Sequence, residues 1–287
     1  MRTPRETAIT YKTLLVHVDD SERCVHRIEA AARLALEFGG RLVGVYLVPT
    51  PELTPSVSAL LPDSVVNQRL AESGEAQHSA EARFRAAATG TGLAAIEWRA
   101  PAGDPTQAIV AHTRGVDLAV IGQPEPGDVD APFGIDLANA VVLASGRPVL
   151  AIPYIGIQGA IGETVLIALD RSRESARAVA DALPLLARAR RVVVLAVTAA
   201  AEETLGDTQA RAEAVAHLRG HGIEAEVHHL DLPDIGIGEL LLSQAADFGA
   251  DLIVMGAYGH ARFQELVLGG VTRTMLEAMT VPVLMSH

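Results

Sequence analysis

Residues 251–259 read Asp-Leu-Ile-Val-Met-Gly-Ala-Tyr-Gly, and residues 269–272 read Gly-Gly-Val-Thr. The first run is apolar over the length of a buried strand and ends in glycine. The second run opens a segment in which apolar residues recur at the spacing of one helical face, namely Val271, Met275, Leu276 and Met279. The stretch therefore predicts a strand, a glycine loop and a helix, in that order.

The glycines of this stretch allow two interpretations. Backbone amides without a neighbouring Cβ can approach an anion closely, and the amino end of the following helix adds a positive dipole end. Alternatively, the glycines serve only tight turns. Their placement at the end of a strand and at the start of a helix favours the first interpretation, a phosphate-binding loop.

The spacing Gly256-x2-Gly259-x9-Gly269 resembles the ATP-binding signature of the universal stress protein family. The resemblance implies that ATP, with or without Mg²⁺, or another adenine nucleotide binds at this loop. One residue departs from the pattern, because ATP binders of that family usually carry Ser or Thr after the third glycine and this chain carries Gly270. The departure removes a hydroxyl donor to phosphate and leaves the Gly270 amide in place.

Two copies of one pattern follow each other along the chain. Residues 12–21 parallel residues 163–172, residues 117–122 parallel 251–256, and residues 147–150 parallel 281–284. Each copy reads βαβαβαβαβ, and its continuous apolar runs indicate parallel strands covered on both faces. We expect an α/β protein with two tandem, doubly wound, Rossmann-like domains of five parallel strands each, over residues 1–155 and 160–287. The family resemblance implies the same fold.

The expected binding site lies in the second copy. Ligands of open α/β sheets bind beyond the carboxyl ends of the strands, where the strand order reverses. The resemblance implies that Asp170 lies near the adenosine, that Val197 and Met255 enclose the base, and that the glycines surround the phosphates. The alternative role for Asp170 is that of a helix N-cap. The alternative for His260 and Arg262 in the loop is that they are simply solvated. The expected nucleotide-binding residues are Asp170, Val197, Met255, Gly256, Gly259, His260, Arg262, Gly269, Gly270, Val271 and Thr272.

The corresponding loop of the first copy differs in its chemistry. Glu125 stands where the second glycine belongs. Three prolines lack the amide donors that a phosphate would need, namely Pro124, Pro126 and Pro132. Two further acids, Asp128 and Asp130, would repel a phosphate. We therefore expect no ATP in the first copy. Its expected role is that of a built-in partner of the second copy. Because the last strand commonly lies at the dimer contact in the universal stress protein family, the resemblance implies an intramolecular counterpart of that dimer through residues 148–152 and 282–285. A further homodimer stays open.

Composition excludes several partner classes. The net charge of −12 and the sequence pI near 5.3 oppose binding to nucleic acid or to anionic membranes, and an aromatic content of 3% leaves few stacking platforms. A single cysteine, Cys24, forbids an intrachain disulfide. The sequence shows no signal core and no run as long as a membrane span, so a cytoplasmic protein is expected.

No catalytic or metal-ligating set emerges from the sequence. His217 and His221 have the spacing of a helical zinc pair but lack a third ligand. Ser21 and Ser172 lack the surroundings of a nucleophile and are expected to cap helices.

The sequence thus predicts a stress-response or regulatory factor that binds an adenine nucleotide in its second copy, with slow or no hydrolysis. Two alternatives are an interaction protein of the same fold with a lost ATP site, and an enzyme that uses Asp170 as a base.

Overall fold

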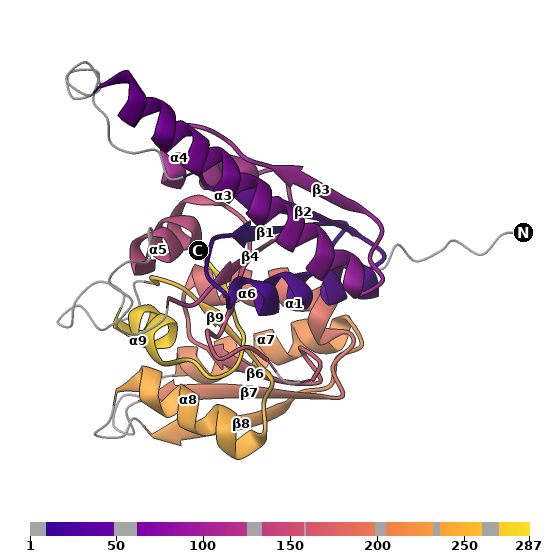
Figure 1. Cartoon of the computed structure of the whole chain (residues 1–287). Coiled ribbons are helices and arrows are strands. Elements are labelled where there is room, and N and C mark those ends of the chain that lie inside the picture. Colours follow the sequence, from indigo (N-terminus) through magenta and orange to yellow (C-terminus); the bar gives the residue numbers. More distant parts are fainter. Residues whose placement is uncertain are drawn as a thin grey trace, which may run out of the picture. The chain divides into compact units, whose positions relative to one another are not determined.

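The computed structural model of the protein describes residues 10–48, 62–124, 134–157, 159–198, 205–231, 236–259 and 270–287. Strands and helices alternate along both copies (Figure 1). The first copy contains β1 (Thr13–Val18), α1 (Cys24–Glu37), β2 (Arg41–Tyr46), α3 (Asp63–Gly90), β3 (Ile96–Arg99), α4 (Pro105–Thr113), β4 (Leu118–Gly122), α5 (Gly134–Ala144) and β5 (Val149–Ile152). The second contains β6 (Thr164–Leu169), α6 (Arg173–Leu186), β7 (Arg191–Thr198), α7 (Leu205–Gly220), β8 (Glu226–Asp231), α8 (Ile237–Phe248), β9 (Leu252–Gly256), α9 (Gly270–Ala278) and β10 (Val283–Ser286).

The chain divides into two compact units. Lys12–Arg147 and Tyr154–Gly156 form one unit, whereas Pro148–Pro153 and Ile157–His287 lie in the other. In the first of these, the strands follow the order β3-β2-β1-β4 and pair in parallel, and α1 contacts α3 while α4 contacts α5. The predicted α/β fold with doubly wound parallel strands is confirmed.

The other unit has the strand order β5-β10-β9-β6-β7-β8. All neighbours for which the register is known are parallel except β5 and β10, which pair antiparallel with Leu150 opposite Leu284. The last strand of the first copy therefore joins the compact unit of the second copy, where it covers a strand that would otherwise be an edge. The expected pairing of the two last strands is present.

Matching polar interactions recur in the two copies. The Asp117 carboxylate accepts hydrogen bonds from the amides of Lys12 at 2.7 Å and Thr13 at 2.9 Å. Asp251 accepts equivalent bonds from the amides of Glu163 at 3.0 Å and Thr164 at 3.3 Å, and a further one from the Gly162 amide at 2.8 Å. Each acid ties the start of the first strand in its copy to the turn before the fourth, so one plan builds both copies.

Local signals explain several helix ends. The Asp104 side chain accepts a bond from the Gln107 amide at 2.7 Å and caps α4, and Gly39 adopts the positive φ of 57° that favours glycine after α1. The expected cap at Ser21 is wrong, because α1 begins at Cys24 with Arg23 as a cap that makes no side-chain bond. The Ser21 hydroxyl donates to Asp19 instead, at 2.6 Å. In the described ranges, no helix is long and apolar enough to cross a membrane.

Candidate functional site

The site in the second copy forms where strand order reverses. β6 pairs with β7 on one side and with β9 on the other, and Ala168 lies opposite Met255 in the β6–β9 register. Consequently, the turn after β6 and the loop after β9 leave the sheet at the same edge, which is the place where ligands bind open α/β sheets. Asp170, Met255, Gly256 and Gly259 are thereby brought together.

The turn after β6 is fixed by its own side chains. Asp170 Oδ1 accepts bonds from the amide of Ser172 at 2.8 Å and from its hydroxyl at 2.5 Å. Ser172 Oγ in turn accepts from the Ser175 amide at 3.0 Å and caps α6, as expected. The alternative in which Asp170 itself caps this helix is therefore wrong. Both bonds to Asp170 use Oδ1, and within the described residues its Oδ2 on this exposed side chain accepts no hydrogen bond, which leaves it available to a ligand.

The first two glycines of the motif are demanded by close packing. A Cβ on Gly256 would lie 2.5 Å from the Ser175 amide nitrogen, and one on Gly259 would lie 3.0 Å from Ser172 Oγ. At Gly270, a Cβ would meet no atom of the described residues within 4 Å. Gly256 and Gly259 thus let the loop approach the turn after β6, whereas no described neighbour requires a glycine at position 270. This packing accounts for the turn interpretation of the two glycines, and the ligand interpretation stays a prediction.

Tyr258 and Thr272 join the loop to α9. Tyr258 has a positive φ of 57°, and its amide donates to Thr272 Oγ1 at 3.3 Å. Thr272 is only 2% exposed, so its side chain holds the loop from within. Gly270 is exposed at the start of α9, where the helix dipole is positive, and Val271 follows it half-buried.

The remaining predicted residues fall in two groups. Val197 lies half-buried near the carboxyl end of β7, the strand beside β6. His260, Arg262 and Gly269 lie outside the described residues. In the first copy, the acidic and proline-rich residues 125–133 also lie outside them, so its loop chemistry stays a prediction.

Glu174 is a neighbour of the loop that the sequence interpretation missed. A Cβ on Gly259 would lie 3.4 Å from Glu174 Oε2, and the Glu174 side chain is 3% exposed. Burial raises the pKa of Glu174, but the hydrogen bond and charge of Arg173, a backbone hydrogen bond and the nearby His287 together hold that pKa below its usual range. A negative charge under the loop opposes a phosphate there unless cations offset it.

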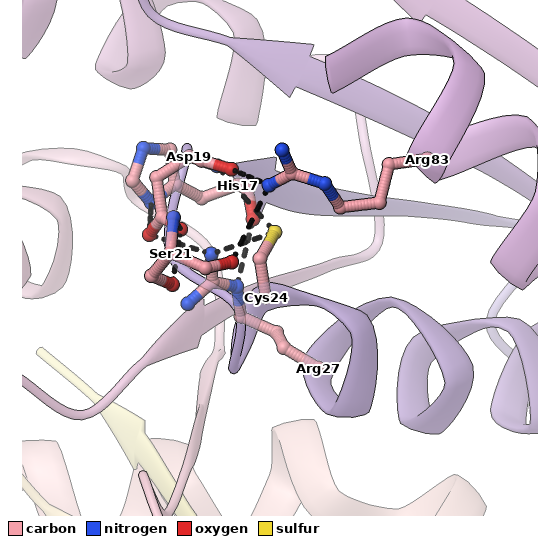
Figure 2. Close-up of polar contacts among 6 residues, drawn as sticks. All are labelled: His17, Asp19, Ser21, Cys24, Arg27 and Arg83. Atoms are coloured by element: carbon pink, nitrogen blue, oxygen red, sulfur yellow. Dashed lines mark hydrogen bonds and ion pairs between the residues drawn. The ribbon is translucent and has the colours of Figure 1, made fainter. Parts of the chain in front are cut away.

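The turn after β1 repeats the same geometry in the first copy (Figure 2). The amide and hydroxyl of Ser21 donate to Asp19 Oδ1 at 3.1 and 2.6 Å. The Asp19 amide donates to Cys24 Sγ at 3.5 Å, as the Asp170 amide donates to Ser175 Oγ at 3.3 Å. Cys24 therefore takes the place of Ser175, which agrees with the expected packing role of this buried cysteine.

One side chain sets the first copy apart. The Arg27 guanidinium, on a residue only 6% exposed, donates from Nη2 to Asp19 Oδ2 at 2.8 Å and from Nε to the His17 carbonyl at 2.7 Å. Arg83 of α3 donates to the Asp19 carbonyl at 3.1 Å. Figure 2 shows these side chains gathered around Asp19. Burial raises the pKa of Asp19, but Arg27, His17 and the hydrogen bond from Ser21 together hold that pKa well below its usual range.

Two tandem copies of parallel strands whose order reverses beside a glycine-containing turn define a doubly wound α/β class of protein. The model of the universal stress protein family matches residues 10–153 and again 163–287, and the chain belongs to that family. No curated protein is significantly similar to it in sequence.

Two solved structures that match nearly the whole chain show the same fold. A universal stress protein from Archaeoglobus fulgidus DSM 4304 is 18% identical, with a TM-score of 0.73 and coverage of 96% of this chain and 97% of that chain. A functionally unknown protein from Pseudomonas aeruginosa PAO1 is 14% identical, with a TM-score of 0.57 and coverage of 96% and 92%. A universal stress protein from Archaeoglobus fulgidus in complex with dAMP is 22% identical, with a TM-score of 0.34 and coverage of 50% and 98%.

Proposed function

We propose that this universal stress protein is a cytoplasmic regulatory factor of the stress response that binds one adenine nucleotide in its second copy. The nucleotide is ATP or a relative, with or without Mg²⁺, and hydrolysis is slow or absent. The observation that carries the proposal is the meeting of Asp170 with the glycine loop at the β6–β9 reversal. There, Oδ2 of Asp170 and the amino end of α9 are open to a ligand.

The parts of the site have distinct roles in this proposal. Asp170 Oδ2 accepts a hydrogen bond from a hydroxyl of the adenosine, and Val197 and Met255 pack against the base. The backbone of Gly256, Gly259 and residues 269–271 faces the phosphates, with the positive end of α9 behind them. These roles explain binding and assign no residue to a hydrolytic step.

A second candidate is a nucleotide-independent interaction protein whose ATP site has been lost. Two observations favour it. Gly270 provides no hydroxyl to a phosphate, and the buried Glu174 carboxylate lies next to Gly259. Each weakens the affinity for a free triphosphate, and a bound cation such as Mg²⁺ would offset the second effect.

Nucleotide analysis of the purified protein, with ATP titration by calorimetry on the same sample, tests the proposal. One adenine nucleotide per chain supports it. No nucleotide and no heat up to millimolar ATP would leave the interaction protein as the function. The titration is repeated with ADP, AMP and adenosine, and with and without Mg²⁺, to find which part of the ligand supplies the affinity.

The variant Gly259→Val localises the site. Its side chain collides with Ser172 beneath the loop, so nucleotide affinity should fall about tenfold or more. Gly115→Val is the matched control, because a Cβ on Gly115 meets nothing within 4 Å and Gly115 lies in the first copy. Equal losses in both variants would contradict the assignment of the site to the second copy.

A further inference from the structure

The two copies differ at one helical position that faces their first turns. When the two copies are aligned on Asp19 and Asp170, Arg27 of α1 and Ala178 of α6 occupy equivalent positions. Ala178 is fully buried and too short to reach a carboxylate, whereas Arg27 reaches Asp19 Oδ2 at 2.8 Å. The oxygen that Asp170 leaves open in the second copy is therefore engaged in the first.

The Arg27 guanidinium lies so close to Gly122 that a side chain at that position would collide with it. A Cβ on Gly122, the last residue of β4, would lie 1.9 Å from Arg27 Nη1. In the second copy, a Cβ on Gly256 would instead meet the backbone at the start of α6, with Ser175 N at 2.5 Å. The Arg27 side chain thus lies between the start of α1 and the end of β4, at the strand-order reversal of the first copy.

We propose that Arg27 is an internal ligand of the first copy, which occupies Asp19 and thereby excludes an adenosine ligand from that copy. The exclusion rests on the proposed function, because it treats Asp19 as the counterpart of the acid that contacts adenosine. The occupation of Asp19 by a guanidinium stands on the geometry alone.

The chemistry of the pair makes the exclusion effective. A ribose hydroxyl is a neutral donor, and hydrogen bonds to a carboxylate from a guanidinium are markedly stronger. A ligand that displaced Arg27 would leave a buried guanidinium without its anion, which is costly in a low-dielectric interior. The His17 carbonyl and Cys24 Sγ hold the same guanidinium by further contacts at 2.7 and 3.3 Å, so it is fixed from three sides.

Chemical rescue of Arg27→Ala tests the occupation. The truncation removes two methylenes and the guanidinium, which together correspond to N-ethylguanidinium. We expect the midpoint of thermal unfolding to fall by about 10 °C and to recover at least half of this loss in millimolar N-ethylguanidinium. N-ethylurea has nearly the same shape without the charge and should not restore it.

Arg33→Ala is the control variant. Arg33 also belongs to α1, is half-exposed and pairs with Glu29 at 3.1 Å on the surface. Its removal should cost little and should show no response to N-ethylguanidinium. Equal rescue of Arg27→Ala by N-ethylurea, or no rescue by either compound, would overturn the proposal, because Arg27 would then act only through its volume.

Nucleotide stoichiometry of the wild-type protein tests the exclusion. One equivalent per chain is the expected result. Two equivalents would overturn the exclusion even if the rescue succeeded. No bound nucleotide would overturn the proposed function, and the rescue would still decide whether Arg27 serves as the internal ligand of Asp19. The two proposals therefore fail in distinguishable ways.

Discussion

Gly270 is the residue at which the loop of the second copy departs from the family pattern. Because a Cβ at this position meets none of the described residues within 4 Å, a serine should fit there without moving them. Gly270→Ser places a hydroxyl at the start of α9, and a hydrogen bond to a charged phosphate contributes about 1.5–3 kcal/mol. We expect ATP affinity to rise about tenfold or more, as measured by calorimetry.

Gly270→Ala separates the hydroxyl from the side effects of losing a glycine. Both substitutions favour the helix, but only serine offers a donor to phosphate. The same affinity gain in both variants would show that helix ordering, and not the hydroxyl, limits binding. No gain in either variant would place the phosphates away from Gly270.

His17 makes the first copy sensitive to acid. It is 5% exposed on β1, and burial together with the nearby Arg27 cation lowers its pKa from 6.5 to about 4. Between these two values, the unfolded chain binds a proton that the folded chain does not, so stability falls as pH drops from 6.5 to 4. The full loss is about 3 kcal/mol. Asp19 affects stability at lower pH. Because its pKa is depressed in the folded protein, its contribution to stability is lost only as the pH falls below the ordinary value of 3.8.

The variant His17→Ala carries the residue found at the equivalent position of the second copy, Ala168. It removes the titrating group, so the free energy of unfolding should change less between pH 7 and pH 4.5 than in the wild type. Urea denaturation at the two pH values measures the difference. A cavity lowers stability at both pH values alike and leaves the slope unchanged. An unchanged pH dependence would show that His17 does not cause it.

At the scale of elements, the starts of α1 and α6 differ although their turns share Asp-x-Ser. Ser172 caps α6 and also donates to Asp170, whereas Ser21 donates to Asp19 and caps no helix. Ser172→Ala should therefore cost about 1 kcal/mol more than Ser21→Ala, the usual contribution of an N-cap. It should also weaken nucleotide binding, because the turn that orients Asp170 is loosened. Equal costs in chemical denaturation would contradict the cap assignment.

The sequence predicts the elements well where one local signal decides. Apolar runs locate the strands, and Asp104 with Pro105 marks the start of α4 because cap and proline act within one turn. The glycine loop and Asp170 are also predictable, since parallel strands place both at one edge. Arg27 is missed, because an arginine in a helix usually faces solvent and only tertiary packing places it beside Asp19. Ser21 is misassigned for a local reason, because its hydroxyl can either bond Asp19 or cap the helix, and the sequence does not rank these two partners.

For the whole molecule, the informative strand is β5. It belongs to the first copy by sequence, yet it pairs antiparallel with β10 inside the compact unit of the second, with Ala151, Leu150 and Val149 opposite residues 283–285. The internal repeat predicts a boundary between the copies at residues 153–162. A repeat shows the order of the elements along the chain and not which strands pair, so it does not predict that β5 pairs with β10. β5 joins the unit of the second copy, where it covers the edge that β10 would otherwise expose.

The cover provided by β5 predicts how fragments behave. A fragment of residues 157–287 keeps the second copy but lacks β5, so one side of β10 is left with unpaired backbone groups beside the buried Val283, Leu284 and Met285. Exposed edges of this kind pair with another chain, and we expect the fragment to form dimers or larger species. A fragment of residues 148–287 retains β5 and should associate much less at the same concentration. Size-exclusion chromatography with light scattering measures the number of chains per particle for each fragment. The same number for both fragments would mean that β5 is not what keeps β10 from pairing with itself.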